Sequence, residues 1–282
     1  MKYVSIIFSC LFLSSVSADA KELLNIKFGI YGSDRLSEIN RKFTPILNEI
    51  KFNMSRSMSV PVNIEMIFYK SYEKGVEAIV KGEVDFIRLG PVSYVFAKQE
   101  NDDISILATE SYKGGKNFNG VVCVRATSSI FKVEDLKGKK FIFGNKKSTS
   151  GRYMAQKYLY DNGIKSSDLS KYGYALNHGD VAILIAKGSY DAGAFKSGVL
   201  KNEHLSKALR VIAEFPVVTH PWVAKKNMPI EIRNHLSNAL LDINDVEVFK
   251  GLKRTGFVTG SDKDYENIRK AINDNYLFFS KN

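Results

Sequence analysis

Few residues in this sequence can form cross-links, metal sites or linkers. The 282 residues include only two cysteines, four histidines and six prolines. Cys123 lies in an apolar segment, so we expect a buried and inert thiol. The histidines are far apart, and no Cys/His group has metal-ligand spacing, so we expect no metal and no cofactor. No internal repeat and no Pro/Gly-rich linker is present, which excludes a solenoid and a string of tethered domains.

Negative charge is also under-represented, with 30 acidic residues against 41 basic ones and a net charge of +11. The basic residues are scattered, and no nucleic-acid-binding motif accompanies them, so we expect no nucleic-acid partner. Apolar residues make up 44% of the chain and charged residues 25%, which is ordinary globular composition. The length fits one large domain or two lobes.

Residues 1–20 have the pattern of an export signal. A short positive start precedes an apolar run from 3 to 16, and small residues allow cleavage after Ala18 or Ala20. The run is shorter than the roughly 20 residues that a membrane span needs. A bulky residue two positions before Cys10 disfavours lipid attachment there. We therefore expect export through a cleavable signal peptide and a periplasmic location.

After this segment, predicted strands and helices alternate, and the alternation restarts once. The expected strands cover residues 25–30, 62–68, 84–89, 104–108, 120–124, 140–143, 172–176, 192–195 and 209–213. The expected helices cover residues 37–54, 71–81, 150–162, 180–187, 229–242, 246–252 and 265–279, with another beginning at Pro91 and a helical turn at 133–138. This order predicts an α/β fold of two units with mostly parallel sheets flanked by helices. The second unit is inserted in the first or follows it.

The segment from Phe143 to Gly151 is the sharpest candidate for anion binding. A strand ends there, and a helix opens beside the consecutive hydroxyls of Ser148, Thr149 and Ser150. The first N–H groups of a helix lack intrahelical partners and carry the positive end of its dipole. Hydroxyl groups can add donors to the same oxyanion. The alternative is that these side chains only cap the helix.

Two other strand-to-helix turns share this arrangement. Near Pro91, N–H groups at Val92 and Ser93 are candidate donors, and Tyr94 either contributes or packs inside. His178 falls between a strand and a helix, where it either binds an oxyanion or has a structural role. Tyr72 begins another helix. Ligands bind outside the carboxyl ends of parallel strands, so these turns meet in one cleft if the two units face each other.

Several of these segments together resemble the periplasmic phosphonate-, phosphite- and phosphate-binding proteins of ABC transporters. The matching segments are Lys-Gly-Glu-Val-Asp-Phe at 81–86, Leu-Gly-Pro-x-x-Tyr at 89–94, Asp-Leu-Lys-Gly-Lys-Lys at 135–140, Phe-Gly-x-x-x-Ser-Thr-Ser-Gly at 143–151, and His178 with Tyr-Asp-Ala-Gly-Ala at 190–194. The Ser-Thr-Ser-Gly segment followed by a histidine about thirty residues later is the most specific of them. The resemblance extends from about residue 25 to about residue 260.

The resemblance implies a type II periplasmic-binding-protein fold, in which two lobes joined by two crossover strands close on a ligand in the cleft between them. The first lobe would comprise residues 21–122 and 216–282, and the second residues 123–215. In the family, the Ser-Thr-Ser loop and the histidine hold the phosphorus oxyanion. Tyr72 corresponds by position to a tyrosine that joins them from the opposite lobe.

This chain departs from the family pattern at two places. Phe118 stands where family members often have a tyrosine, which removes a phenol donor. Gly198 and His220 stand where aminophosphonate binders place carboxylates for the ligand ammonium. His220, together with Lys196, instead favours more negative charge. We therefore expect phosphate, phosphite or an alkylphosphonate as the ligand, and we expect 2-aminoethylphosphonate to bind no better than methylphosphonate.

These observations predict a monomeric solute-binding protein that performs no chemistry and delivers its ligand to an ABC importer. A sensor that reports lobe closure to a membrane kinase or cyclase is the alternative, and nothing in the sequence separates the two. A hydrolase using Ser148 or Ser150 with His178 and Asp180 is a third reading. It lacks the Gly-x-Ser-x-Gly turn that usually presents such a nucleophile.

Overall fold

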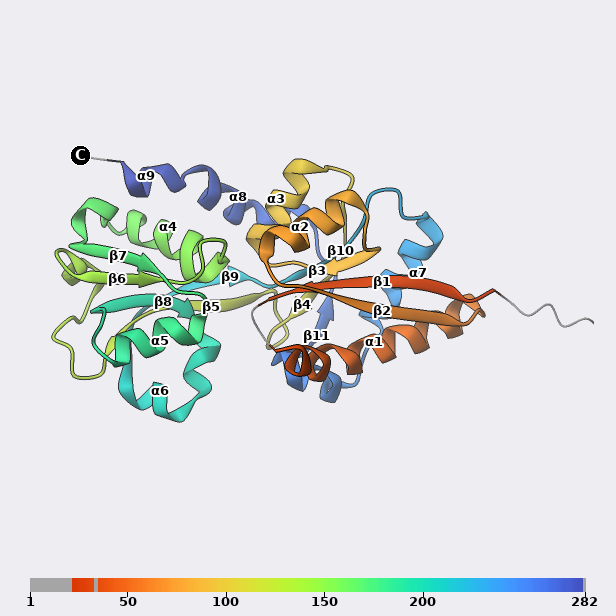
Figure 1. The fold of residues 1–282 in the computed structure, drawn as a ribbon, viewed down its shortest axis with the longest axis horizontal. Coiled ribbons are helices and arrows are strands. Elements are labelled where there is room, and N and C mark those ends of the chain that lie inside the picture. Colours follow the sequence, from red (N-terminus) through yellow and green to blue (C-terminus); the bar gives the residue numbers. More distant parts are fainter. Residues whose placement is uncertain (1–21, 33–34, 281–282) are drawn as a thin grey trace, which may run out of the picture.

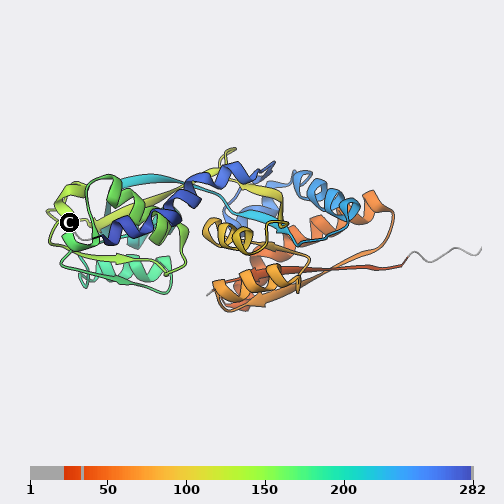
Figure 2. The ribbon, with the colours of Figure 1, turned by 90° about the horizontal axis from the view of Figure 1, so that it is seen from above.

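A computed structural model describes residues 22–32 and 35–280 of the chain. The expected signal peptide lies outside these residues. The described residues form two lobes, each built on one sheet with helices on both faces (Figure 1). Seen from above, the lobes lie end to end (Figure 2). No helix in the described ranges is long and apolar enough to cross a membrane.

The sheet of the first lobe has six strands in the order β11-β4-β10-β3-β1-β2. These strands are β1 (Leu24–Tyr31), β2 (Val62–Tyr69), β3 (Phe86–Arg88), β4 (Ser105–Ser111), β10 (Pro221–Ala224) and β11 (Gly256–Val258). One face packs on α1 (Leu36–Met58), α7 (Ile230–Leu241) and the 3₁₀ segment η5 (Val246–Leu252). The other face packs on α2 (Tyr72–Lys81), α3 (Pro91–Glu100) and α8 (Glu266–Asn273), which follows the 3₁₀ segment η6 (Asp262–Tyr265).

The sheet of the second lobe has five strands in the order β7-β6-β8-β5-β9. These strands are β5 (Asn117–Arg125), β6 (Lys140–Phe143), β7 (Lys171–Tyr174), β8 (Ala192–Lys196) and β9 (Leu209–Val218). One face packs on α4 (Met154–Asp161), which continues the π-helical turn η2 (Thr149–Tyr153), and on α9 (Asn275–Phe279). The other face packs on α5 (His178–Ala186) and α6 (Glu203–Ala208). Short 3₁₀ segments are η1 (Val133–Leu136), η3 (Ser166–Asp168) and η4 (Ser197–Lys201).

The predicted alternation of strands and helices is confirmed, but the sheets are less parallel than expected. β1 pairs in parallel with β2 and β3, and β6 with β7 and β8. The other pairings, which involve β4, β5, β9, β10 and β11, are antiparallel. The cause is that β5 and β9 carry the chain between lobes in opposite directions. The sequence reading did not identify β10, β11 and α6, which are at most six residues long and too short to show a period.

The lobe boundaries differ from those the resemblance implied. All of β5 and β9 belongs to the second sheet, so the chain changes lobe near residues 112–116 and again near 219–220. The C-terminal segment is shared between lobes. Helix α8 packs on α3 in the first lobe, whereas α9 packs on α4 in the second. Phe278 of α9 is buried in the core of the second lobe, where its ring meets Phe143.

Candidate functional site

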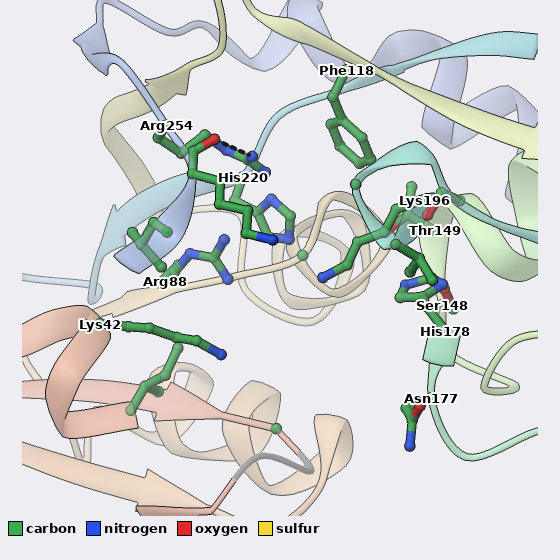
Figure 3. A pocket seen from close by; sticks show the side chains of 18 of the residues that line it. Lys42, Arg88, Phe118, Ser148, Thr149, Asn177, His178, Lys196, His220 and Arg254 are labelled. Carbon is green, nitrogen blue, oxygen red and sulfur yellow. Dashed lines mark hydrogen bonds between the residues drawn. The ribbon is translucent and has the colours of Figure 1, made fainter. Parts of the chain in front are cut away.

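A cavity of about 660 Å³ lies between the two lobes. Its lining includes residues at or just beyond the carboxyl ends of β1, β3, β6, β7 and β8, as expected for a sheet whose strand ends meet a cleft. We call one side the second-lobe wall, formed by Ser148, Thr149, Ser150, His178 and Lys196. We call the other the first-lobe wall, formed by Lys42, Arg88, His220 and Arg254. The two walls face each other across the cavity (Figure 3).

The three consecutive hydroxyl residues of the second-lobe wall occupy the start of the η2–α4 helix. Ser148 is the N-cap, and its Oγ accepts a hydrogen bond of 3.0 Å from the N–H of Gly151. Capping therefore accounts for Ser148, but not for Ser150, whose hydroxyl makes no hydrogen bond to another described residue. The N–H groups of Thr149 and Ser150 precede the first intrahelical bond. The wall thus presents hydroxyl and backbone donors at the positive end of a helix.

His178 is the first residue of α5 and also lines the cavity. It is not the helix cap, because the side chain of Asn177 accepts the 2.9 Å hydrogen bond from the N–H of Asp180. The Nδ1 atom of His178 is buried and has no hydrogen-bond partner in the described residues. Burial, and then the charge of Lys196, lower the pKa of His178 to about 3. A neutral imidazole that can donate through one ring N–H therefore faces the cavity.

The turn before α3 contacts the second lobe instead of offering free donors. The N–H of Val92 donates to Thr149 Oγ1 across the lobe boundary at 3.1 Å. The N–H of Gly90 donates to Tyr31 Oη at 2.6 Å. The expectation that Val92 has a free N–H group is therefore wrong in this structure. This turn positions Thr149 and holds the lobes together at one end of the cavity.

The structure does not bring Ser93 and Tyr94 to the cavity, although both were candidate ligands. Each is almost fully buried, and neither lines the cavity. Tyr94 points toward the C-terminal segment, where its hydroxyl donates to Asp262 at 2.7 Å. Its position on α3, three residues past the helix start, turns it away from the second lobe. Tyr72 does line the cavity and packs its ring against Tyr31, with 5.0 Å between the ring centroids.

The first-lobe wall is built on a buried carboxylate, Glu110. Arg88 binds it through two N–H groups, with Nε to Oε1 at 2.5 Å and Nη2 to Oε2 at 3.1 Å. Arg254 Nε donates to Oε2 at 2.8 Å, and Trp222 donates to Oε1 at 3.3 Å. Burial alone would raise the pKa of Glu110, but the charges of Arg88 and Arg254 outweigh it and hold the pKa below its ordinary value. The carboxylate is ionised and fixes both guanidinium groups.

His220 and Phe118 complete this side of the cavity. The two rings stack, with centroids 6.2 Å apart and planes inclined by 21°. His220 Nδ1 is buried without a hydrogen-bond partner among the described residues and lies 3.7 Å from Glu110 Oε2. Burial and the charge of Arg88 hold the pKa of His220 well below its ordinary value. Phe118 supplies an apolar face to the cavity and has no hydroxyl to donate, as expected from the sequence.

Comparison with known proteins agrees with the fold. The profile of a family described as "ABC transporter, phosphonate, periplasmic substrate-binding protein" matches residues 28–265. The chain belongs to this family. A probable ABC transporter phosphite-binding protein from Prochlorococcus marinus is 23% identical over 291 residues, which cover 94% of this chain and 93% of that protein.

Two solved structures show that this phosphonate-binding family member has the two-lobed fold of other binding proteins. The first is a Prochlorococcus marinus protein of that family in complex with methylphosphonate, with a TM-score of 0.73, 22% identity and coverage of 90% of this chain and 98% of that one. The second is a binding protein component of an ABC phosphonate transporter from Pseudomonas aeruginosa, with a TM-score of 0.72, 19% identity and coverage of 91% and 88%.

Positive charge around the cavity of this family member exceeds what the sequence reading anticipated. Within residues 22–32 and 35–280, seven basic side chains line it, against the single carboxylate of Glu38; they are Arg41, Lys42, Arg88, Lys196, Lys201, Lys253 and Arg254. Of these seven, only Lys196 was expected near the ligand from the sequence. Arg88 had a detectable signal, because it ends a strand just before the Gly-Pro turn. Arg254 had none, since it lies in an irregular segment far along the chain.

Proposed function

We propose that this periplasmic binding protein holds a small phosphorus oxyanion, with phosphate, phosphite and alkylphosphonates as the candidates, against the second-lobe wall. Ser148, Thr149, Ser150 and His178 would donate hydrogen bonds to its oxygens. Tyr72 would approach these oxygens from the first lobe, and His220 would face the ligand from the same lobe farther from the helix start. Hydrogen bonds from several neutral donors at a helix start can hold a compact anion without burying an extra charge.

One observation carries this proposal. The buried Nδ1 atom of His178 has no hydrogen-bond partner in the described residues, and His178 lines the same cavity as Ser148, Thr149 and Ser150. Unsatisfied polar groups in a buried site are costly unless a ligand or water completes their hydrogen bonds. A tetrahedral oxyanion has enough acceptor positions to serve these donors together.

Binding between two lobes links ligand capture to transport. Residues of both lobes line the cavity, so a ligand that contacts both walls favours the closed arrangement over the open one. We propose that the closed monomer is the form that an ABC permease recognises. We also propose that residues 1–20 direct export and are removed. No structural feature favours the alternative sensor role.

The arrangement around His178 supports binding over hydrolysis. In a serine hydrolase, a carboxylate accepts the Nδ1–H of the catalytic histidine and orients the ring. Here His178 Nδ1 has no partner among the described residues, and Asp180 instead accepts a 2.8 Å hydrogen bond from Asn177 Nδ2. Ser148 Oγ accepts from the Gly151 N–H at 3.0 Å. The three side chains do not form a relay that could activate a hydroxyl nucleophile.

Isothermal titration with phosphate, phosphite, methylphosphonate and sulfate tests the proposal. We expect at least one phosphorus oxyanion to bind and to raise the melting temperature as its concentration rises, because a ligand of the folded state stabilises it by mass action. Sulfate serves as the control for nonspecific attraction to a basic cavity. Equal binding of all four anions, or none, would contradict a site built for phosphorus oxyanions.

A further inference from the structure

We infer that the first-lobe wall is a second anion subsite, and that the natural ligand is a phosphonate or phosphoester with a further anionic group, such as a carboxylate, on a short tail. The inference rests on the proposed function, because it takes the second-lobe wall as the site of the phosphorus group. It adds the chemical class of the rest of the ligand. The subsite consists of Arg88, Arg254 and His220 around Glu110.

This cluster has the construction of a prepared binding site. The side chain of Glu110 is 0% exposed, and those of Arg88 and Arg254 are 16% and 12% exposed. Their guanidinium groups are held in place by the carboxylate and by nearby rings, with Arg88 5.7 Å from the centre of Phe43 and Arg254 5.5 Å from the centre of Phe118. Groups fixed before binding lose little freedom when a ligand arrives.

The cluster also keeps donors for a ligand. Arg88 uses Nε and Nη2 on Glu110, and Arg254 uses Nε on Glu110 and Nη1 on a backbone oxygen. Within the described residues, Arg88 Nη1 and Arg254 Nη2 make no hydrogen bond. The buried His220 Nδ1 makes none either, but it lies 3.7 Å from Glu110 Oε2 and so faces the carboxylate. The remaining donors of a guanidinium form a planar fork that matches a carboxylate or phosphate. All three residues line the cavity.

Charge counting favours an anion over a cation at this wall. Two guanidinium groups against one carboxylate leave one net positive charge, and a neutral His220 adds none. Lys42 and Lys196 border the same space, with Lys196 on the opposite side and directed toward Arg88 (Figure 3). Among the described residues, the one carboxylate in the cavity lining is Glu38. A ligand ammonium would therefore meet net positive charge, and a ligand carboxylate would meet its complement.

The volume of the cavity indicates that the two walls bind two different groups of one ligand. Methylphosphonate occupies on the order of 100 Å³, the share of three or four waters at about 30 Å³ each. The cavity is about 660 Å³, and its two sets of donors belong to opposite walls. A phosphonate group held at the helix start therefore leaves space between itself and the first-lobe wall. A short tail with an anionic end fills that space.

A tail series tests this inference by titration calorimetry at fixed pH and salt. The probes are methylphosphonate, propylphosphonate, 2-aminoethylphosphonate, phosphonoacetate and 3-phosphonopropionate. We expect one of the two carboxylates to bind at least tenfold more tightly than propylphosphonate, and 2-aminoethylphosphonate to bind no better than methylphosphonate. If the phosphonates bind with no preference for the carboxylates, the inference fails while the proposed function stands. If none of the phosphonates binds but phosphate or phosphite does, the inference also fails while the proposed function stands. If neither the phosphonates nor phosphate nor phosphite binds, the proposed function itself fails.

Substitutions test whether the preference for carboxylate-bearing ligands arises at the first-lobe wall. Arg254→Gln should reduce the ratio of carboxylate to propylphosphonate affinity to about one. Lys253→Gln removes the same charge from an exposed neighbour at the rim and should keep most of the ratio. Arg254→Lys keeps a positive charge beside Glu110 and should fold even if Arg254→Gln does not. It should lower the ratio, because it lacks the forked donors. Equal weakening of methylphosphonate and the carboxylates by both Arg254 variants would show that the arginines bind the phosphorus group, and would overturn the inference.

Discussion

The two walls of the cleft bind charge in different ways. The second-lobe wall has hydroxyls, helix N–H groups and a neutral imidazole, most of them supplied by short continuous segments after β6 and β7. The first-lobe wall has fixed positive charges, Arg88 and Arg254, arranged around the buried Glu110. A compact oxyanion can be held by neutral dipoles alone. A wall of permanent charge indicates that more than one anionic group enters the cavity.

The largest expected effect is a loss of stability on substitution of Glu110, the buried carboxylate of the first-lobe wall. Glu110→Gln leaves two largely buried guanidinium groups without a counter-charge, which should lower the free energy of unfolding by about 3–5 kcal/mol. Urea denaturation measures the change. Glu214→Gln is the control, since Glu214 is exposed and pairs with Asn119, and it should cost about 0.5 kcal/mol or less. A loss below about 1 kcal/mol for Glu110→Gln would mean that the carboxylate does not hold the wall together.

Acid should destabilise the two walls in different pH ranges. The pKa of His178 is about 3 in the folded chain and about 6.5 in the unfolded chain. Between these two pH values the unfolded chain is protonated at His178 and the folded chain is not. Stability then falls as the pH drops from 6.5, by up to about 1.4 kcal/mol per pH unit for one such group. The folded pKa of Glu110 lies below its ordinary 4.5, so its contribution is complete above that pH and is lost below it.

His178→Gln separates these two contributions in urea denaturation repeated from pH 7 to pH 4. The variant should have a shallower decline than the natural chain from pH 6.5 down to pH 4, and the additional loss from Glu110 should begin near pH 4.5 in both chains. His220 also has a lowered pKa, so part of the decline should remain. An unchanged slope above pH 4.5 would show that the His178 ring is not held in its neutral form by the fold.

Substitutions at the second-lobe wall should affect binding more than folding. Ser148→Ala, Thr149→Ala and Ser150→Ala each remove a donor to a charged acceptor, which costs roughly 1.5–3 kcal/mol or about tenfold or more in methylphosphonate affinity. Ser189→Ala, at an exposed serine of the same lobe, is the control. If titration calorimetry finds unchanged affinity in all three variants, the hydroxyls serve only to cap and connect the helix start.

The smallest effect is expected at Tyr94, which lies outside both walls. Tyr94→Phe removes the hydrogen bond to Asp262 and should lower the free energy of unfolding by about 1 kcal/mol. Methylphosphonate affinity should not change, because the side chain does not line the cavity. A clear loss of affinity at unchanged stability would return Tyr94 to the ligand site.

Local sequence patterns predicted the second-lobe wall better than the first. Ser148, Ser150 and His178 follow strands and begin helices, and a strand-to-helix turn is visible in a few consecutive residues. The structure places all three at the cavity, although their contact with a ligand stays a prediction. The group of Arg88, Glu110 and Arg254 was not predictable in this way. Its members are 22 and 144 residues apart along the chain, and only the folded sheet brings them together.

The helix start at Pro91 shows why a correct local reading can still assign the wrong role. Proline does stand at the first helical position, as predicted. The sequence could not show that Thr149 from the other lobe would accept the Val92 N–H, nor that Tyr94 would face η6. Both outcomes depend on how elements pack across the lobe boundary, which has no signature within the turn itself.

The C-terminal segment forms a third connection between the two lobes, in addition to the two crossovers of the chain. In Figure 1, α8 and α9 cross between lobes on the side of β5 and β9 opposite to α1 and α5. A rotation of the lobes that brings α1 and α5 closer together would therefore move α8 and α9 apart, because they lie on the opposite side of β5 and β9. The segment is anchored to α4 by Asn275, whose amide donates to Gln156 at 2.9 Å and accepts from Arg152 at 3.2 Å. Helix α8 packs on the first lobe and α9 on the second, so this segment has to accommodate any change in the angle between the lobes, although none of residues 262–280 lines the cavity.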